Sequence, residues 1–115
     1  MNGKRVLIVE DDYVIAQGLS HAIADNGFTV VGPVDTADLA VRLIANEPPD
    51  GALLDVRLRD GSSVEVAKAL QERGVPFIVM SGHSRDTLPF ELKKAPFVAK
   101  PMSESELVNT ARSTF

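Results

Sequence analysis

Four strongly apolar runs mark this chain, and a polar side chain follows directly after each of them. The runs and the residues after them are Val6–Val9 before Glu10 and Asp11, Ala52–Leu54 before Asp55, Phe77–Met80 before Ser81, and Phe97–Ala99 before Lys100. A buried strand of a parallel sheet has a continuous hydrophobic sequence, and open sheets of this type bind ligands beyond the carboxyl ends of their strands. The pattern therefore predicts that three carboxylates, one hydroxyl and one ammonium group meet at one edge of a sheet.

Amphipathic segments between the apolar runs predict helices. The serines at 62 and 103 are each followed three residues later by a glutamate, which is the spacing of a capping box. Between Gly82 and Ala95, Pro89 fits only in the first turn of a helix, so a short or irregular fourth helix is expected there. The expected helices begin near Asp11 or Asp12, at Asp35–Thr36, at Ser62, within 82–95 and at Ser103, and the first three end at Asn26–Gly27, Pro48–Pro49 and Gly74.

Two more segments complete the pattern of strands. Phe28–Val34 is rich in β-branched residues and predicts a strand, and Gly51–Leu54 is the strand that precedes Asp55. Strands that alternate with helices along the whole chain predict an α/β fold with a doubly wound five-stranded parallel sheet. The common strand order 2-1-3-4-5 places the switch point, where such sheets bind ligands, between the strands that end at Glu10 and Asp55.

Length and charge restrict the classes of protein that the chain can belong to. Its 115 residues predict one domain, 1–115, and the absence of cysteine excludes a disulfide framework and a thiol nucleophile. The apolar stretch near the N-terminus is too short for a signal peptide or a membrane span, so a cytoplasmic protein without membrane contact is expected. A net charge of −4 and a pI of about 5.1 argue against a nucleic-acid partner.

Three converging carboxylates repel one another, and a hard divalent cation with oxygen ligands relieves that repulsion. Mg²⁺ fits best, with Asp11 and Asp55 as direct ligands and Glu10 holding a bound water. Asp55 is also placed to act as a nucleophile that accepts a phosphoryl group, with Lys100 and Ser81 around the transferred oxygens. Each of these residues alone also fits a structural role as a helix cap, a turn residue or a solvated side chain, and only their combination favours function.

Four short motifs carry a resemblance to a known family. They are Val-Glu-Asp-Asp at 9–12, Leu-Leu-Asp at 53–55, Met-Ser-Gly at 80–82 and Ala-Lys-Pro at 99–101. Through these motifs the chain resembles a response-regulator receiver domain, a flavodoxin-like fold, over essentially its whole length. The resemblance implies the following roles: Glu10 and Asp11 as the acidic pair, Asp55 as the phosphoacceptor, Ser81 as the switch hydroxyl, Phe97 as the switch aromatic, Lys100 as the phosphate-binding lysine, the backbone carbonyl of Arg57 as a Mg²⁺ ligand, and a cis peptide before Pro101.

The chain departs from the usual receiver pattern in three places. Arg59 stands where a proline is common, Gly61 follows Asp55 by only six residues, and Ser81 replaces the commoner threonine. The run Pro76–Gly82, with the weak fourth helix after it, resembles an α-proteobacterial group of mostly stand-alone receivers. The family's usual output surface on the fourth helix is therefore not carried over to this chain.

A receiver of this type is expected to be a signalling switch of a two-component or phosphorelay system rather than a metabolic enzyme, although it takes part in its own phosphorylation and dephosphorylation. A sensor histidine kinase or a histidine phosphotransfer protein would donate the phosphoryl group to Asp55, and a downstream protein would respond. No output domain is expected after Phe115, although a fragment of a longer protein would look the same.

Several alternatives stay open at this point. Arg57 and His83 are expected at the mouth of the site, where they either modulate the lifetime of the phosphoryl group or are solvated side chains. A receiver-shaped scaffold that is not regulated by phosphorylation is one alternative function, although no residue of the site is missing. A Mg²⁺-dependent phosphatase is another, but such enzymes often carry an aspartate where this chain has Arg57.

Overall fold

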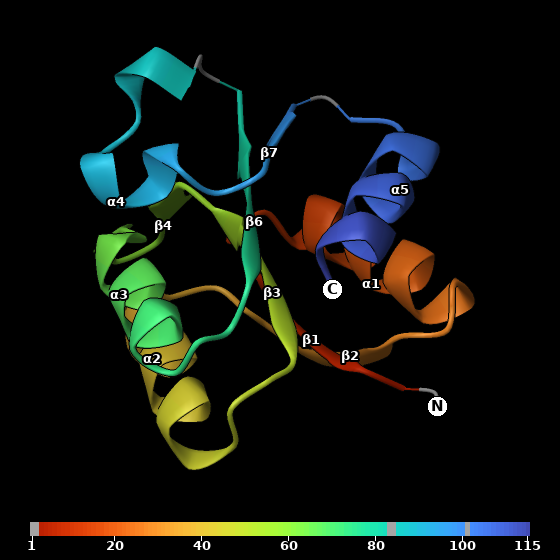
Figure 1. The fold of residues 1–115 in the computed structure, drawn as a ribbon, viewed down its shortest axis with the longest axis horizontal. Coiled ribbons are helices and arrows are strands. Elements are labelled where there is room, and N and C mark those ends of the chain that lie inside the picture. Colours follow the sequence, from red (N-terminus) through yellow and green to blue (C-terminus); the bar gives the residue numbers. More distant parts are fainter. Residues whose placement is uncertain (1–2, 83–84, 101) are drawn as a thin grey trace.

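A parallel sheet with helices on both faces forms the centre of the protein (Figure 1). The computed structural model describes residues 3–82, 85–100 and 102–115. The strands of the central sheet are β1 (Arg5–Val9), β2 (Thr29–Val34), β3 (Gly51–Asp55), β6 (Phe77–Ser81) and β7 (Phe97–Ala99). They run parallel in the order β2-β1-β3-β6-β7, which confirms the predicted order 2-1-3-4-5.

Helices cover the two faces of the sheet. α1 and α5 lie on one face, and α2, α3 and α4 lie on the other (Figure 1). The expected short fourth segment is confirmed, because it consists of one 3-10 turn and a single turn of α-helix. The bounds are α1 (Tyr13–Asp25), α2 (Ala37–Asn46), α3 (Val64–Glu72), η1 (Arg85–Thr87), α4 (Phe90–Lys93) and α5 (Glu104–Thr114). No helix among the described residues is long and apolar enough to cross a membrane.

The inner strands have a core on each face, because successive side chains of a strand point in opposite directions. Leu7, Leu54 and Val79 face α2 and α3, whereas Ile8 and Leu53 face α1 and α5, and all five are fully buried. Full burial of one such side chain stabilises the fold by roughly 1.5–3 kcal/mol. This double burial explains why the apolar runs are continuous rather than alternating.

Three helices begin with the side-chain caps that their sequences indicate. Asp12 Oδ1 accepts a hydrogen bond from the Ile15 N–H at 3.1 Å, and Thr36 Oγ1 accepts one from the Leu39 N–H at the same distance. Ser103 Oγ likewise accepts the N–H of Glu106 at 3.1 Å. These caps fix the start of α1 at Asp12 rather than Asp11 and confirm the predicted start of α5.

The predicted start of α3 at Ser62 is wrong by one residue. The N-cap is Ser63, and its hydroxyl makes no cap bond but donates to the Val56 carbonyl at 3.0 Å. The cause is a small antiparallel hairpin that the sequence pattern did not predict, formed by β4 (Arg57–Leu58) and β5 (Gly61–Ser62). Pairing in this hairpin takes Ser62 out of the helix.

Two expectations fall on residues that the structure does not describe. His83 and the peptide bond before Pro101 both lie outside the described residues. The cis peptide bond found among the described residues joins Gly32 to Pro33 in β2.

Candidate functional site

The three predicted carboxylates meet where β1 and β3 end. Glu10 follows β1, Asp11 comes next, and Asp55 is the last residue of β3, the strand that pairs with β1. One carboxylate oxygen from each of the three side chains lies within 4.8 Å of the other two. Glu10 is 2% exposed and Asp55 8% exposed, whereas Asp11 is open to solvent. The sheet topology therefore brings together residues that are 45 positions apart.

Lys100 reaches this cluster from the other side of β6. Its Nζ donates hydrogen bonds to Glu10 Oε1 at 2.9 Å and to Asp55 Oδ1 at 3.0 Å. The backbone N–H of Lys100 donates to the Ser81 carbonyl at 2.8 Å, which continues the pairing of β6 with β7 and fixes where the side chain starts. The ammonium group thus bridges the two buried carboxylates.

Burial shapes the electrostatics of this cluster. It raises the pKa of the Glu10 carboxyl above 4.5, and repulsion from Asp55 adds to this despite the hydrogen bond from Lys100. Burial alone would lower the pKa of Lys100, but its hydrogen bonds to Glu10 and Asp55 raise it above 10.5. One ammonium beside three carboxyl groups gives the cluster an excess of acidic side chains. Oxygen ligands with an excess of negative charge are the donor set that fits a hard divalent cation.

Ser81 and Arg57 lie beside the carboxylate cluster. Ser81 ends β6 and is only 2% exposed, and Arg57 opens the small hairpin with its side chain in solvent. Both line a cavity of about 560 Å³, whose other wall includes Leu88 and Pro89 before α4. Ser81, the predicted switch residue, therefore lines a space that also contacts Val56, the residue after Asp55.

Phe97 lies outside the carboxylate cluster. It starts β7 opposite Val79 and packs, half-buried, against the core under α2 and α3. Its strand pairs with the strand of Ser81, through the partners Ser81 and Ala99. The two predicted switch residues are therefore on neighbouring strands, and their roles stay predictions, as does that of His83.

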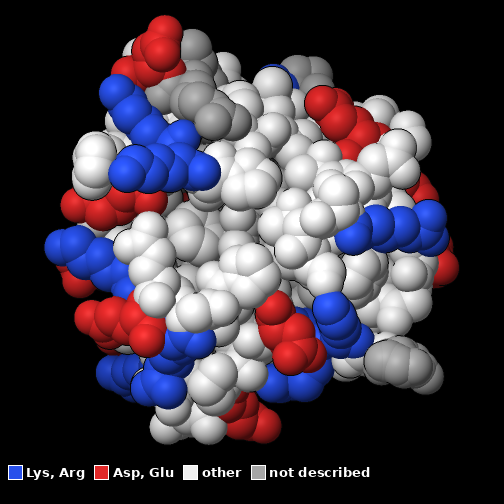
Figure 2. Space-filling view, in the orientation of Figure 1, with Lys and Arg blue, Asp and Glu red and all other residues white. Residues whose placement is uncertain are grey.

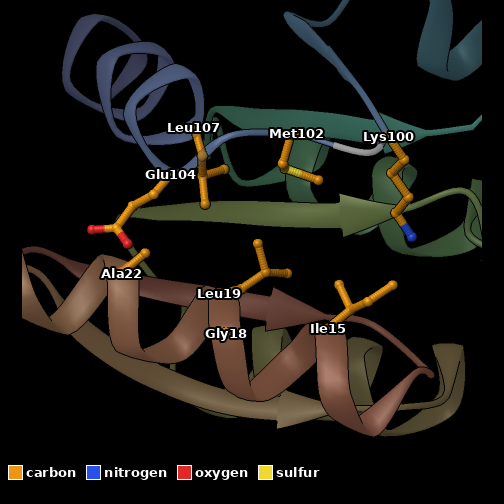
Figure 3. Close-up of a pocket in the computed structure, with 8 residues that line it drawn as sticks. All are labelled: Ile15, Gly18, Leu19, Ala22, Lys100, Met102, Glu104 and Leu107. Atoms are coloured by element: carbon orange, nitrogen blue, oxygen red, sulfur yellow. The ribbon is translucent and has the colours of Figure 1, made fainter.

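Sequence reasoning did not predict an apolar groove between α1 and α5. The groove has a volume of about 530 Å³, and its walls include Ile15 and Leu19 from α1 and Leu107 from α5. Figure 3 shows the Lys100 side chain at one end of the groove and Glu104 at the other. The spacing of apolar residues predicts helices but not this groove, because the open space between two helices depends on how they pack. The groove connects the surface of α1 with the stem of the lysine that binds Asp55.

Charges of both signs surround one face of the molecule. Figure 2 shows acidic and basic side chains intermixed around the periphery of the face seen in Figure 1, with an uncharged centre.

Comparison with known proteins agrees with this geometry. The family model described as the response regulator receiver domain matches residues 6–112. The chain belongs to this family. This receiver is 31% identical over 111 residues to the transcriptional regulatory protein YdfI of Bacillus subtilis, covering 92% of the chain and 52% of YdfI. It is 27% identical over 109 residues to PdtaR of Mycobacterium tuberculosis, covering 91% of the chain and 53% of PdtaR. The receiver thus spans about half the length of these curated relatives.

Solved structures match the receiver over nearly its whole length. The receiver domain of the Erythrobacter litoralis response regulator PhyR superposes with a TM-score of 0.86 at 29% identity, covering 98% of this chain and 90% of that one. The receiver domain of the Pseudomonas aeruginosa sensor histidine kinase PA1611, solved with a magnesium ion in its active site cleft, has a TM-score of 0.86 at 22% identity, with 97% of both chains covered. The second match supports the fold alone.

Proposed function

We propose that this receiver is a phosphoacceptor switch that takes a phosphoryl group from a phosphohistidine onto Asp55 in the presence of Mg²⁺. The donor is a sensor histidine kinase or a histidine phosphotransfer protein, and the phosphorylated form changes its binding to a downstream protein. The observation that supports this most strongly is the contact of the Lys100 ammonium with Asp55 Oδ1 at 3.0 Å, inside a cluster with two more carboxylates.

The chemistry follows from the contacts of Asp55. Its Oδ1 accepts hydrogen bonds from the Val56 N–H and from Lys100, both at 3.0 Å, so we assign the attack to Oδ2. Oδ2 forms a bond to phosphorus while the bond from phosphorus to the imidazole nitrogen of the donor breaks. The electron pair of that bond stays on the ring, whose other nitrogen carries a proton. The products are an acyl phosphate on Asp55 and a neutral histidine on the donor.

Positive charge must compensate the negative charge of the phosphoryl oxygens as they approach Asp55. Lys100 supplies it from the protein, because its ammonium group is already held 3.0 Å from Asp55. Asp11, Asp55 and the Arg57 backbone carbonyl would hold Mg²⁺ directly and Glu10 would hold it through a water, and the bound ion would supply further positive charge. Glu10 also accepts the Asp12 N–H at 3.1 Å, which orients its carboxylate.

The new charge on Asp55 is the signal. The phosphoryl oxygens attract the Ser81 hydroxyl, and movement at the end of β6 changes the packing of Phe97 on the adjacent strand. A phosphoryl group can shift the population toward one arrangement of these strands only by binding it more strongly than the other. The exposed Arg57 side chain, at the mouth of the cavity beside Ser81, is placed to slow the approach of a hydrolytic water.

The two alternative functions lack the support of a specific contact. A phosphatase needs a second acid near its nucleophile to release the product, and the chain has the exposed Arg57 two residues after Asp55. A scaffold has no need of a lysine that bridges two buried carboxylates, which is a costly arrangement to maintain.

The intact mass of the protein after incubation with acetyl phosphate tests the proposal. We expect one phosphoryl group per chain with Mg²⁺ and none with a chelator. Repeated turnover of an aryl phosphate would instead establish the phosphatase. Failure to accept a phosphoryl group from acetyl phosphate and from a phosphorylated histidine phosphotransfer protein would overturn the proposal in favour of the scaffold.

A further inference from the structure

The turn of the β4–β5 hairpin is hydrogen-bonded to the start of α2. Asp60 Oδ1 accepts the Ala37 N–H at 2.7 Å, and Asp60 Oδ2 accepts the Asp38 N–H at 3.2 Å. The side chain of Thr36, the local cap, accepts the Leu39 N–H at 3.1 Å. Two of the first three amides of α2 are therefore capped by a residue more than twenty positions further along the chain.

Arg59, the other residue of the turn, contacts the same helix start. Its Nη2 lies 2.9 Å from Asp35 Oδ2, and its backbone N–H donates to the Asp35 carbonyl at 3.2 Å. The ion pair is exposed and contributes little on its own. The Asp60 bonds are charge-assisted, and the N–H of Ala37 lowers the pKa of that carboxyl, so Asp60 is ionised at neutral pH. The hydrogen bonds of Asp60 therefore attach the turn to α2 more strongly than the ion pair between Arg59 and Asp35 does.

The base of the hairpin is fixed as firmly as its tip. The backbone N–H and the hydroxyl of Ser63 both donate to the Val56 carbonyl, at 3.1 and 3.0 Å, and Ser63 is fully buried. Leu58 is buried in the core under α2 and α3. Arg57 lies between these anchors, two residues after Asp55, so the path of its backbone is set by contacts on both sides.

We propose that Asp60 is a positioning residue for the cation site: by capping α2 it holds the hairpin, and the hairpin fixes the position of the Arg57 backbone carbonyl, two residues after Asp55. The inference rests on the proposed function, because this carbonyl becomes a ligand only if the site binds Mg²⁺. A short loop that is fixed in advance loses less conformational entropy when it binds an ion. The hydrogen bonds between Asp60 and the start of α2 therefore contribute to the affinity of the site for Mg²⁺.

The chain offers a matched control for this proposal. Asp60→Ala removes two cap bonds of α2 and with them the hydrogen bonds of the Asp60 side chain that attach the hairpin, whereas Thr36→Ala removes a cap bond of the same helix and leaves those attachments intact. Asp60→Asn keeps an acceptor for the Ala37 N–H and serves as the conservative variant. The affinity for Mg²⁺ alone, measured by calorimetry without any phosphodonor, is the primary measurement.

We expect Asp60→Ala to weaken Mg²⁺ binding roughly tenfold, the lower end of the range for residues that orient metal ligands. Thr36→Ala should bind Mg²⁺ within about twofold of the wild type, and Asp60→Asn should recover most of the loss. Saturating Mg²⁺ should restore the rate at which Asp60→Ala accepts a phosphoryl group from acetyl phosphate. Amide hydrogen exchange over residues 57–62 should be faster in Asp60→Ala than in Thr36→Ala.

Two results would overturn the inference while the proposed function stands: wild-type affinity in Asp60→Ala, or an equal loss in Asp60→Ala and Thr36→Ala, which would reduce Asp60 to a helix cap. A wild-type protein that binds no Mg²⁺ and accepts no phosphoryl group would overturn both.

Discussion

Lys100 Nζ donates a hydrogen bond of 3.0 Å to Asp55 Oδ1 across 45 residues of sequence. The contact spans β6, which lies between β3, whose last residue is Asp55, and β7, which ends just before Lys100. In the phosphate-free protein the ammonium group thus stands close to where we place the phosphoryl group. The same contact makes the stability of the fold depend on the charge of the site.

Replacing Lys100 with Met should reduce both phosphorylation and stability. Glu10 and Asp55 would lose their shared donor, and hydrogen bonds to charged groups contribute about 1.5–3 kcal/mol. We expect the free energy of unfolding at neutral pH without metal to fall by about 2 kcal/mol. Urea denaturation with and without Mg²⁺ measures this decrease. A decrease in the free energy of unfolding that is the same with and without Mg²⁺ would show that the lysine stabilises the fold through packing instead.

Asp11→Asn should lose Mg²⁺ binding and yet melt at an equal or higher temperature than the wild type. The side chain is exposed, so little packing is lost, while repulsion within the carboxylate cluster decreases. Calorimetric titration with Mg²⁺ and thermal melting in a chelator provide the two readouts. A variant that melts much lower and still binds Mg²⁺ would contradict the assignment of Asp11 as a ligand.

The raised pKa of Glu10 predicts a specific dependence of stability on pH. A carboxyl whose pKa is higher in the folded state stabilises the fold below its unfolded value, near 4.5, and this contribution is lost as pH rises through the folded value. The metal-free wild type should therefore lose stability relative to Glu10→Gln as pH rises from 4.5 toward neutrality. The difference in melting temperature between the two proteins, followed across this range in a chelator, isolates Glu10. A difference that stays constant with pH would refute the prediction.

The ends of the strands were predictable because burial on two faces makes the sequence of an inner strand uniformly apolar. Glu10, Asp55 and Lys100 could therefore be placed at one edge before any contact was known. The hairpin after Asp55 was not predictable, since its strands have two residues each and show no periodicity. The contacts that hold it include those of Asp60 with α2, more than twenty residues away in the chain, which no local pattern encodes. The same reason explains the error of one residue at the start of α3.

Alanine substitutions at two glycines are expected to change the stability of the protein in opposite directions. A Cβ at Gly51 would lie 2.5 Å from the ring of Phe115, which itself packs edge to face against Phe28 with ring centroids 6.3 Å apart. A Cβ at Gly18, inside α1 and beside the apolar groove, would meet no atom within 4 Å. We expect Gly51→Ala to destabilise the protein by about 1–3 kcal/mol and Gly18→Ala to stabilise it by up to about 1 kcal/mol. Equal melting temperatures for the two variants would contradict the packing of Phe115 on β3.

Phosphoryl transfer to Asp55→Asn is the most direct test of whether Asp55 is the phosphoacceptor. Asp12→Asn is the matched control, because Asp12 lies outside the carboxylate cluster and asparagine also caps a helix. Each protein is incubated with Mg²⁺ and acetyl phosphate and then measured by intact mass, with hydroxylamine to identify an acyl phosphate. We predict one hydroxylamine-sensitive phosphoryl group on the wild type and on Asp12→Asn and none on Asp55→Asn. Labelling of Asp55→Asn to the wild-type extent would contradict the assignment of Asp55 as the phosphoacceptor.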